Sequence, residues 1–299
     1  MSSIIIRQFN PNQSSELAKN QTRIYNQAIS NFPAYLPASV DDVLTIFQGK
    51  GFDYNRMFYA YNESKMIGFS TLSSRDIKNN LRIVSYPWIL KDTSPSVRDL
   101  LFNAMERQCR RERTRILRSF TLESYPDIVD FFMSKKFSIT QEFIIMEKAL
   151  TKNTFYIPLG YKLRPMNKND IDRLEAISLH DPKVKVRFTP SDQNQFRSLS
   201  EFNPADVIVA EKDGKPVGFY ALTIPSDPSK TKAYITGEAI DIREQVIEPY
   251  LVMGLENRAF ERGMKTLVTS FKAGSKRIHL SSERGFKKVG IAFQLDKIL

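Results

Sequence analysis

Cysteine and histidine are almost absent from this 299-residue chain, which contains one cysteine and two histidines. A single cysteine, Cys109, excludes an internal disulfide framework and fits a reducing compartment. No Cys/His/Asp spacing is typical of a metal site, and His180 and His279 lie far apart in the sequence. No apolar run reaches the roughly 18 residues of a membrane-spanning helix. The first residues lack the pattern of a signal peptide, so the cytoplasm is the expected location.

The composition is that of a folded, basic protein. With 41% apolar and 26% charged residues, the chain can bury a core. Its length predicts about two domains. The formal net charge of +11 favours an anionic partner, whether nucleic acid, acidic lipid or a phosphorylated cofactor.

Arginine is densest between residues 107 and 118. On a helix, Arg107, Arg111 and Arg118 would share one stripe. Such a run is typical of a solvated helix end, where cations are favourable near the dipole. The alternative is a surface that binds polyanions, but no known nucleic-acid-binding motif accompanies the run. A nucleic-acid partner at these residues is the less favoured interpretation; they are Arg107, Arg110, Arg111, Arg113, Arg115 and Arg118.

One pattern occurs twice in the chain. Phe58–Phe69 is echoed by Ile208–Phe219, each reading as a strand, a polar turn and a strand with an apolar-Gly-Phe step. Lys135–Phe137 is echoed by Arg284–Phe286, and similar closing segments follow both. The offsets are 150 (208 − 58) and 149 (284 − 135), so the copies stay in register across most of a domain. A period this long indicates duplicated domains.

Each copy reads in the order β-α-α-β-β-β-α-β-α-β. This order predicts the α/β class of the α+β type, with two tandem domains that are each a mixed, largely antiparallel sheet flanked by helices. The predicted domains are residues 1–150 and 161–299, joined by a linker over residues 151–160.

Several element boundaries can be predicted within this frame. We expect one strand over Leu81–Leu90 and a long helix over Glu248–Arg262, closed by Gly263. The closing segments Phe137–Lys148 and Phe286–Leu295 are interpreted as hairpin-like strand pairs.

The order and the Gly-Phe steps resemble the GNAT-type N-acetyltransferase family, here as a tandem pair. Val217–Phe219, Ala259–Lys265 and Glu283–Gly290 match its motifs, and Met66–Phe69 and Ser134–Phe137 match more loosely. The resemblance covers nearly the whole chain. It implies transfer of an acetyl group from acetyl-CoA to a primary amine of a small molecule or a protein.

The family's cofactor loop has the pattern Arg/Gln-x-x-Gly-x-Gly/Ala before the long helix. Its backbone N–H groups and the helix N-terminus face a pyrophosphate. In the second half Arg243 holds the arginine position, while Val246 and Glu248 stand where glycines are expected; the first half shows no such pattern at Asp92, Pro95 and Val97. The resemblance therefore implies cofactor binding in the second half, by Ile240, Ile242, Arg243, Glu244, Gln245, Val246 and Ile247.

The resemblance also implies a carboxylate base and a hydroxyl acid. Glu238, on the strand before the loop, is the predicted base, and the alternative is a solvent-facing strand glutamate. The family's tyrosine position is held by Ser281, the second predicted catalytic residue, and by Phe132 in the first half. The primary hypothesis is an acetyltransferase whose second half is catalytic. The alternative is a non-catalytic protein of this fold that binds acyl-CoA or another anionic partner.

Overall fold

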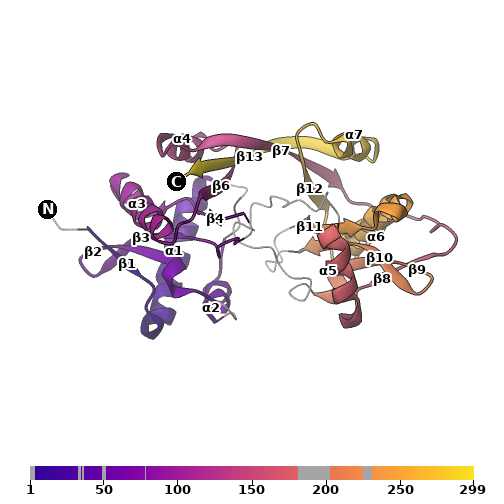
Figure 1. The fold of residues 1–299 in the computed structure, drawn as a ribbon, viewed down its shortest axis with the longest axis horizontal. Helices are drawn as coiled ribbons and strands as arrows, with labels where there is room; N and C mark the ends of the chain where they lie inside the picture. The colour runs from indigo at the N-terminus through magenta and orange to yellow at the C-terminus, as the bar shows by residue number, and fades with distance from the viewer. Residues whose placement is uncertain are drawn as a thin grey trace. The chain divides into compact units, whose positions relative to one another are not determined.

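The computed structural model describes residues 4–32, 35, 37–48, 52–77, 79–180, 203–224 and 231–299. These residues form two compact units. Unit 1 contains the described residues up to Gln141 together with Phe293–Leu299, and unit 2 contains those from Glu142 to Ala292. Each unit consists of β-sheet flanked by helices, as the sequence predicts (Figure 1). No helix of the described residues is long and apolar enough to cross a membrane.

The helices are α1 (Ser14–Ala28), α2 (Val40–Gln48), α3 (Ser96–Arg111) and α4 (Pro126–Ser134) in unit 1, and α5 (Ile171–His180), α6 (Glu248–Glu261) and α7 (Lys276–Glu283) in unit 2. The strands of unit 1 are β1 (Ile4–Gln8), β2 (Met57–Asn62), β3 (Lys65–Thr71), β4 (Leu81–Ile83), β5 (Trp88–Ile89) and β6 (Ile116–Leu122). Those of unit 2 are β8 (Tyr161–Pro165), β9 (Val207–Lys212), β10 (Lys215–Thr223), β11 (Lys232–Ile240) and β12 (Thr266–Lys272). Strands β7 (Ser138–Ala149) and β13 (Lys287–Ile298) contribute residues to both units.

The repeated Gly-Phe step lies where two strands pass closely. Gly68 of β3 pairs with Ile89 of β5, and Gly218 of β10 pairs with Ile240 of β11. A Cβ atom on Gly68 would lie 2.8 Å from Cγ2 of Ile89, and one on Gly218 would lie 3.0 Å from the carbonyl oxygen of Ala239. Both glycines are required because a side chain would force the strands apart. The repeat in the sequence therefore marks one packing constraint that occurs in each unit.

Helices α5 and α6 cover opposite faces of the unit 2 sheet (Figure 1). Along β10, Phe219 and Ala221 pack with α5, while Tyr220 and Leu222 pack on the α6 side. This alternation follows from the two-residue period of a strand. Ile240 of β11 lies on the α6 side as well.

The closing segments are single strands, β7 and β13, so the predicted hairpin-like pairs are wrong. Each long strand lies between two neighbours in the sheet, β7 between β13 and β12 and β13 between β6 and β7, and part of it completes the unit formed by the other half of the sequence. Fully buried Leu295 belongs to unit 1, and Met146 belongs to unit 2. Equivalent ion pairs anchor the two strands to the long helices, Lys297 to Glu106 of α3 and Lys148 to Glu256 of α6, each at 2.7 Å.

These compact units differ from the predicted domains, residues 1–150 and 161–299, in the segments Glu142–Leu150 and Phe293–Leu299. The predicted domains describe the repeat along the chain, whereas the units describe which residues pack together.

The single strand predicted over Leu81–Leu90 is also wrong. It is divided into β4, which pairs with β6, and β5, which pairs with β3. The segment between them must turn from one partner to the other, and Pro87 within it has no N–H to donate to a ladder.

A local difference between the repeats gives a stability prediction. Gly285 and Lys136 each follow a short helix with left-handed φ values of 86° and 66°. Glycine adopts this conformation without steric cost, whereas an L side chain does not. Lys136→Gly is therefore expected to raise the free energy of unfolding of unit 1 by about 0.5–1 kcal/mol. Urea unfolding followed by the fluorescence of Trp88, the chain's one tryptophan, measures this because Trp88 is buried in unit 1. Gly285→Lys is the opposite change at the equivalent position of unit 2. It should leave the unfolding transition followed by Trp88 unchanged, because Trp88 lies in unit 1.

Candidate functional site in unit 2

An opening between two parallel strands defines the candidate site. Strand β11 pairs with β12 only over Lys232–Tyr234, although β11 continues to Ile240. On its other edge, β11 stays paired with β10, with a bulge at Thr236 that shifts the register. The two parallel strands thus separate after a short ladder, and Glu238 lies on the part of β11 beyond it.

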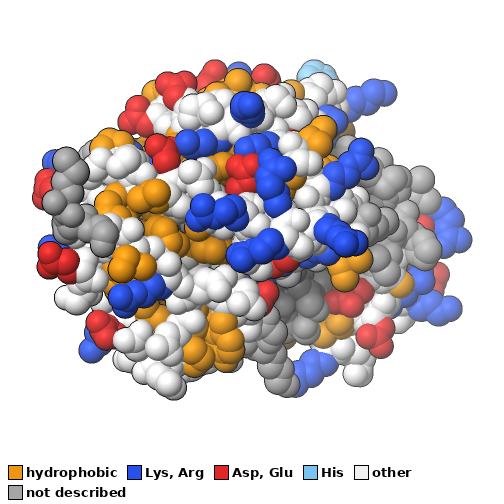
Figure 2. Space-filling model, turned by 60° about the vertical axis from the view of Figure 1, so that its left-hand side comes forward, with side chains coloured by type: hydrophobic (Ala, Val, Ile, Leu, Met, Phe, Trp, Pro, Cys, Tyr) orange, Lys and Arg blue, Asp and Glu red, His pale blue; other side chains and the backbone are white. Residues whose placement is uncertain are grey.

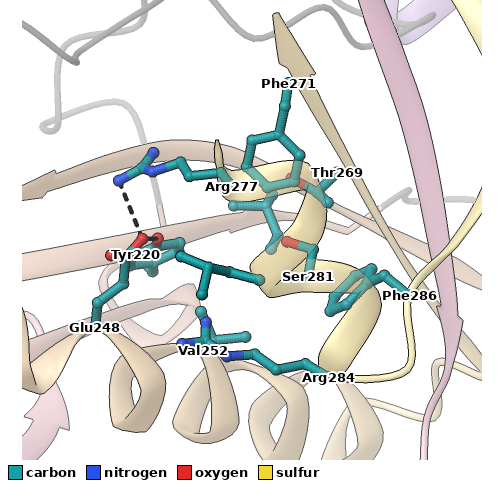
Figure 3. Close-up of a pocket in the computed structure, with 11 residues that line it drawn as sticks. Tyr220, Glu248, Val252, Thr269, Phe271, Arg277, Ser281, Arg284 and Phe286 are labelled. Atoms are coloured by element: carbon teal, nitrogen blue, oxygen red, sulfur yellow. Dashed lines mark hydrogen bonds and ion pairs between the residues drawn. The ribbon is translucent and has the colours of Figure 1, made fainter. Parts of the chain in front are cut away.

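A pocket lies on this part of unit 2 (Figure 3). The space in it for a water-sized sphere is about 20 Å³, roughly that of one water molecule. Side chains therefore fill most of the opening. The lining residues are Tyr220, Ile235, Glu248, Val252, Thr269, Phe271, Arg277, Leu280, Ser281, Arg284 and Phe286.

Arg277 of α7 is the centre of a charged network in this pocket. Its guanidinium contacts the carboxylate of Glu238. It also lies 3.0 Å from the carboxylate of Glu248 (Figure 3). The hydroxyl of Tyr220 donates a 2.9 Å hydrogen bond to Glu248. Burial alone would lower the pKa of Arg277, but Glu238, Tyr220 and Glu248 raise it above its ordinary value. The guanidinium is therefore a fixed positive charge against two carboxylates.

Both predicted catalytic residues belong to this part of unit 2. The side chain of Glu238 is only 9% exposed, so it is not a solvent-facing strand residue. Ser281 lines the pocket and is itself buried. It lies one helical turn after Arg277, which brings both to the same side of α7. Arg277 and Tyr220 were not predicted from the sequence. The spacing of four residues between Arg277 and Ser281 on α7, and the alternation of side chains along β10, were signals that could have identified them.

The predicted cofactor loop is a 3-10 helix, Ile242–Ile247, between β11 and α6. Arg243 is exposed and makes two hydrogen bonds to the carboxylate of Asp241, at 3.1 and 2.9 Å. These bonds, with that from the Arg243 amide, lower the pKa of Asp241 to about 2. Glu244 accepts hydrogen bonds from Tyr161 and Lys212, and Gln245 donates to the backbone oxygen of Asp241.

The apolar residues of the loop are divided between core and surface. Ile240 and Ile247 are buried in the unit 2 core, where they hold the ends of the loop in place. Val246 is 60% exposed. The side chain of Ile242 lies outside the described part of the structure.

The loop does not fit a pyrophosphate group. The amides of Arg243, Glu244 and Glu248 already donate within the loop, and Pro249 has no N–H. Carboxylates at Asp241, Glu244 and Glu248 would repel the phosphates. Beyond its ladder with β12, the end of β11 has an edge with which an extended amide chain such as a pantetheine arm could pair if the side chains that fill the opening moved aside.

The region of unit 1 that corresponds to this pocket contains a cluster of aromatic rings. Trp88 of β5 makes edge contacts with Tyr86 and Tyr35, at centroid distances of 5.2 and 5.3 Å. Phe132, at the position that corresponds to Ser281, is fully buried against Phe137 at 5.0 Å. Unit 1 thus carries a packed aromatic core where unit 2 carries charged and hydroxyl groups.

The remaining reactive side chains do not form a second site. Burial raises the pKa of the Cys109 thiol to about 12, so the arginines around it do not activate it. His279 is 80% exposed beside Glu283, and the side chain of His180 lies outside the described residues. Within the described residues, no group of three or more His, Cys, Asp or Glu side chains could hold a metal ion.

Solved structures share the architecture along the entire chain. A GCN5-related N-acetyltransferase from Sphaerobacter thermophilus aligns with 99% of this chain and 95% of its own, with a TM-score of 0.69 and 15% identity. A tandem GNAT protein from the clavulanic acid biosynthesis pathway aligns over 99% and 98%, with a TM-score of 0.70 and 10% identity. The chain has the tandem GNAT fold.

Other comparisons set the limits of this finding. Saccharomyces cerevisiae N-myristoyltransferase aligns with 99% of this chain and 79% of its own, with a TM-score of 0.65 and 12% identity. The tandem GNAT fold is thus shared with proteins named for the transfer of different acyl groups. The sequence matches no protein-family model and no curated protein.

Proposed function

We propose that this protein is an acyltransferase that uses acetyl-CoA to acetylate a primary amine, with its active site in unit 2. The observation that carries the proposal is the opening between β11 and β12, with Glu238 beside it and the hydroxyls of Tyr220 and Ser281 at the same pocket. The tandem GNAT fold supports the reaction class. The aromatic packing of unit 1 supports unit 2 as the active one.

In this proposal Glu238 accepts the proton of the attacking amine, because it is a buried carboxylate on the part of β11 beyond the ladder with β12. Arg277 holds the side chain of Glu238 in place through their ion pair until the amine enters. The hydroxyl of Ser281, or that of Tyr220, is the proton donor to the leaving group. Acetyl-CoA supplies the thioester, and its pantetheine arm contributes more of the affinity than its pyrophosphate does.

The poor fit of the loop to the pyrophosphate of CoA gives a specific binding prediction. Glu248→Gln removes a negative charge at the first residue of α6 and keeps an oxygen that accepts from Tyr220. We expect the affinity for CoA to rise by about 3- to 10-fold, or roughly 0.7–1.4 kcal/mol. Isothermal titration with CoA and with pantetheine measures this, and only CoA should gain, since pantetheine has no pyrophosphate.

Glu283→Gln is the matched control, because it removes an exposed carboxylate of unit 2 away from the loop. An equal gain for pantetheine would show that Glu248 acts through the pocket and not through the phosphates. Failure of both the native protein and Glu248→Gln to bind CoA at high micromolar concentration would reject the proposed function.

One observation favours a second candidate function, namely binding of acyl-CoA or another anion without turnover. The ion pairs of Arg277 engage Glu238 and fill the pocket. A permanent closure of this kind would prevent an amine from reaching the base. The two functions are distinguished by a single-turnover assay with radiolabelled acetyl-CoA and a panel of amines, in which the binding-only function predicts a retained complex and no acetylated product.

A further inference from the structure

Five exposed arginines of unit 1 form a cluster that we call the arginine corner. It consists of Arg75, Arg107, Arg111, Arg113 and Arg115. Three segments bring it together, namely the residues before β4, the end of α3 and the start of β6. Lys and Arg side chains also gather on the face of the molecule seen in Figure 2.

Hydrogen bonds fix the three segments to one another. The guanidinium of Arg75 donates to the side chain of Asn80 at 2.8 Å and to the backbone oxygen of Arg113 at 3.2 Å. The backbone N–H of Arg115 donates to the carbonyl oxygen of Asn80 at 3.0 Å. Arg107 and Arg111 lie four residues apart on α3 and therefore on one side of that helix. The corner is a fixed arrangement and not only a run of charges along the sequence.

Within the described part of the chain, no carboxylate neutralises the charges of the corner. No carboxylate of the described residues lies within 4.0 Å of any of the five guanidinium groups. The nearby acidic side chains are engaged elsewhere, Glu106 with Arg110 and Lys297 and Glu112 with buried Arg82. In unit 2, by contrast, six of the seven described arginines have a carboxylate within this distance, all except Arg284.

The corner also costs stability. Arg113 has a φ of 56°, in the left-handed region that favours glycine, and Asn80 beside it has a φ of 50°. An arginine in this conformation is less stable than a glycine. Like charges four residues apart on a helix, as at Arg107 and Arg111, repel each other. Arg113 therefore occupies a position where glycine would be more stable.

We propose that the arginine corner binds the phosphate backbone of double-stranded nucleic acid. The planar guanidinium group matches the geometry of phosphate oxygens, and the corner contains arginine and no described lysine. Several cations on neighbouring segments are the usual basis of backbone binding without sequence preference. This function is separate from the acyl transfer proposed for unit 2 and does not depend on it.

The test is fluorescence anisotropy with labelled 20-base-pair DNA and RNA duplexes over a range of salt concentrations. Each phosphate contact contributes about −0.9 to the slope of log K against log salt on DNA. Changing Arg107, Arg111 and Arg113 together to Gln should therefore make the slope shallower by about 2–3 and weaken binding by roughly 10- to 100-fold at 0.1 M salt. The control changes Lys276, Lys287 and Lys288 to Gln, which removes the same charge from exposed positions of unit 2.

A second variant separates binding from folding. Arg113→Gly is expected to raise the unfolding midpoint followed by Trp88, because it relieves the left-handed arginine, and to weaken duplex binding. If the lysine control loses as much duplex binding as the arginine variant, binding depends only on the net charge of the protein, and the proposal is overturned. Equally tight binding of poly-glutamate, or of phosphatidylserine vesicles, by the native protein would also overturn it.

Discussion

Deleting Phe293–Leu299 is expected to unfold unit 1 and to leave unit 2 folded. The deletion removes fully buried Leu295 and the partner of Arg118, which makes two hydrogen bonds to Asp296 at 2.8 and 2.7 Å. It also leaves β6 without its neighbour β13. Losses of this kind total several kcal/mol, a large part of the stability of a small domain. The fluorescence of Trp88 and hydrogen exchange of α3 and β6 should both report an unfolded unit 1.

Point substitutions make this test sharper. Leu295→Ala is expected to destabilise unit 1 by about 2–5 kcal/mol, and Met146→Ala should destabilise unit 2 by a similar amount. Each residue therefore affects the unit formed mainly by the other half of the sequence. Ile298→Ala is the control, because its side chain is 74% exposed. If Leu295→Ala instead speeds hydrogen exchange in α6 and leaves Trp88 unchanged, the assignment of the closing strands to the units is wrong.

Glu238→Gln is expected to lower kcat by about 10²- to 10⁴-fold, the usual contribution of a general base. The amide has the size of the carboxylate and cannot accept the amine proton. Arg277 retains Glu248 as a partner, so the pocket should stay folded. The measurement is release of free CoA thiol with a panel of primary amines, together with titration of CoA, whose affinity should change by less than about 2-fold.

The control for this variant is Glu283→Gln, which should keep full activity. If the Glu238→Gln protein keeps more than half of the native kcat, Glu238 is not the general base and serves only in the ion pair with Arg277. Native protein that binds CoA and releases no thiol with any amine would support the binding-only function instead. The two results are distinguishable because the first leaves turnover and the second does not.

The fold was predictable where a residue type is required by local geometry. Gly68 and Gly218 recur because β3 and β5, and likewise β10 and β11, approach too closely for a side chain, so the repeat predicted two copies of one architecture. The exchange of closing strands was not predictable, because the two halves repeat the same contacts. Lys148 and Lys297 meet equivalent glutamates on α6 and α3, so either closing strand satisfies the pattern of either unit.

The candidate site was predictable in part. Glu238 and Ser281 were predicted from the resemblance, and both lie at one part of unit 2. Arg277 was missed because its importance depends on two carboxylates, Glu238 and Glu248, that are distant from it in the sequence. The state of the loop was likewise hidden, since its backbone donors are engaged through Asp241, whose capping role depends on the backbone conformation.

The exchanged strands also have a consequence for the order in which the protein folds during synthesis. Arg118 and Asp296 are 178 residues apart in the chain. Domains usually fold as they emerge from the ribosome, starting with the N-terminal one. Unit 1 cannot do so here, because Phe293–Leu299 are translated after all of unit 2. Unit 1 therefore stays incomplete, without buried Leu295 and without the partner of Arg118, until unit 2 has been synthesised.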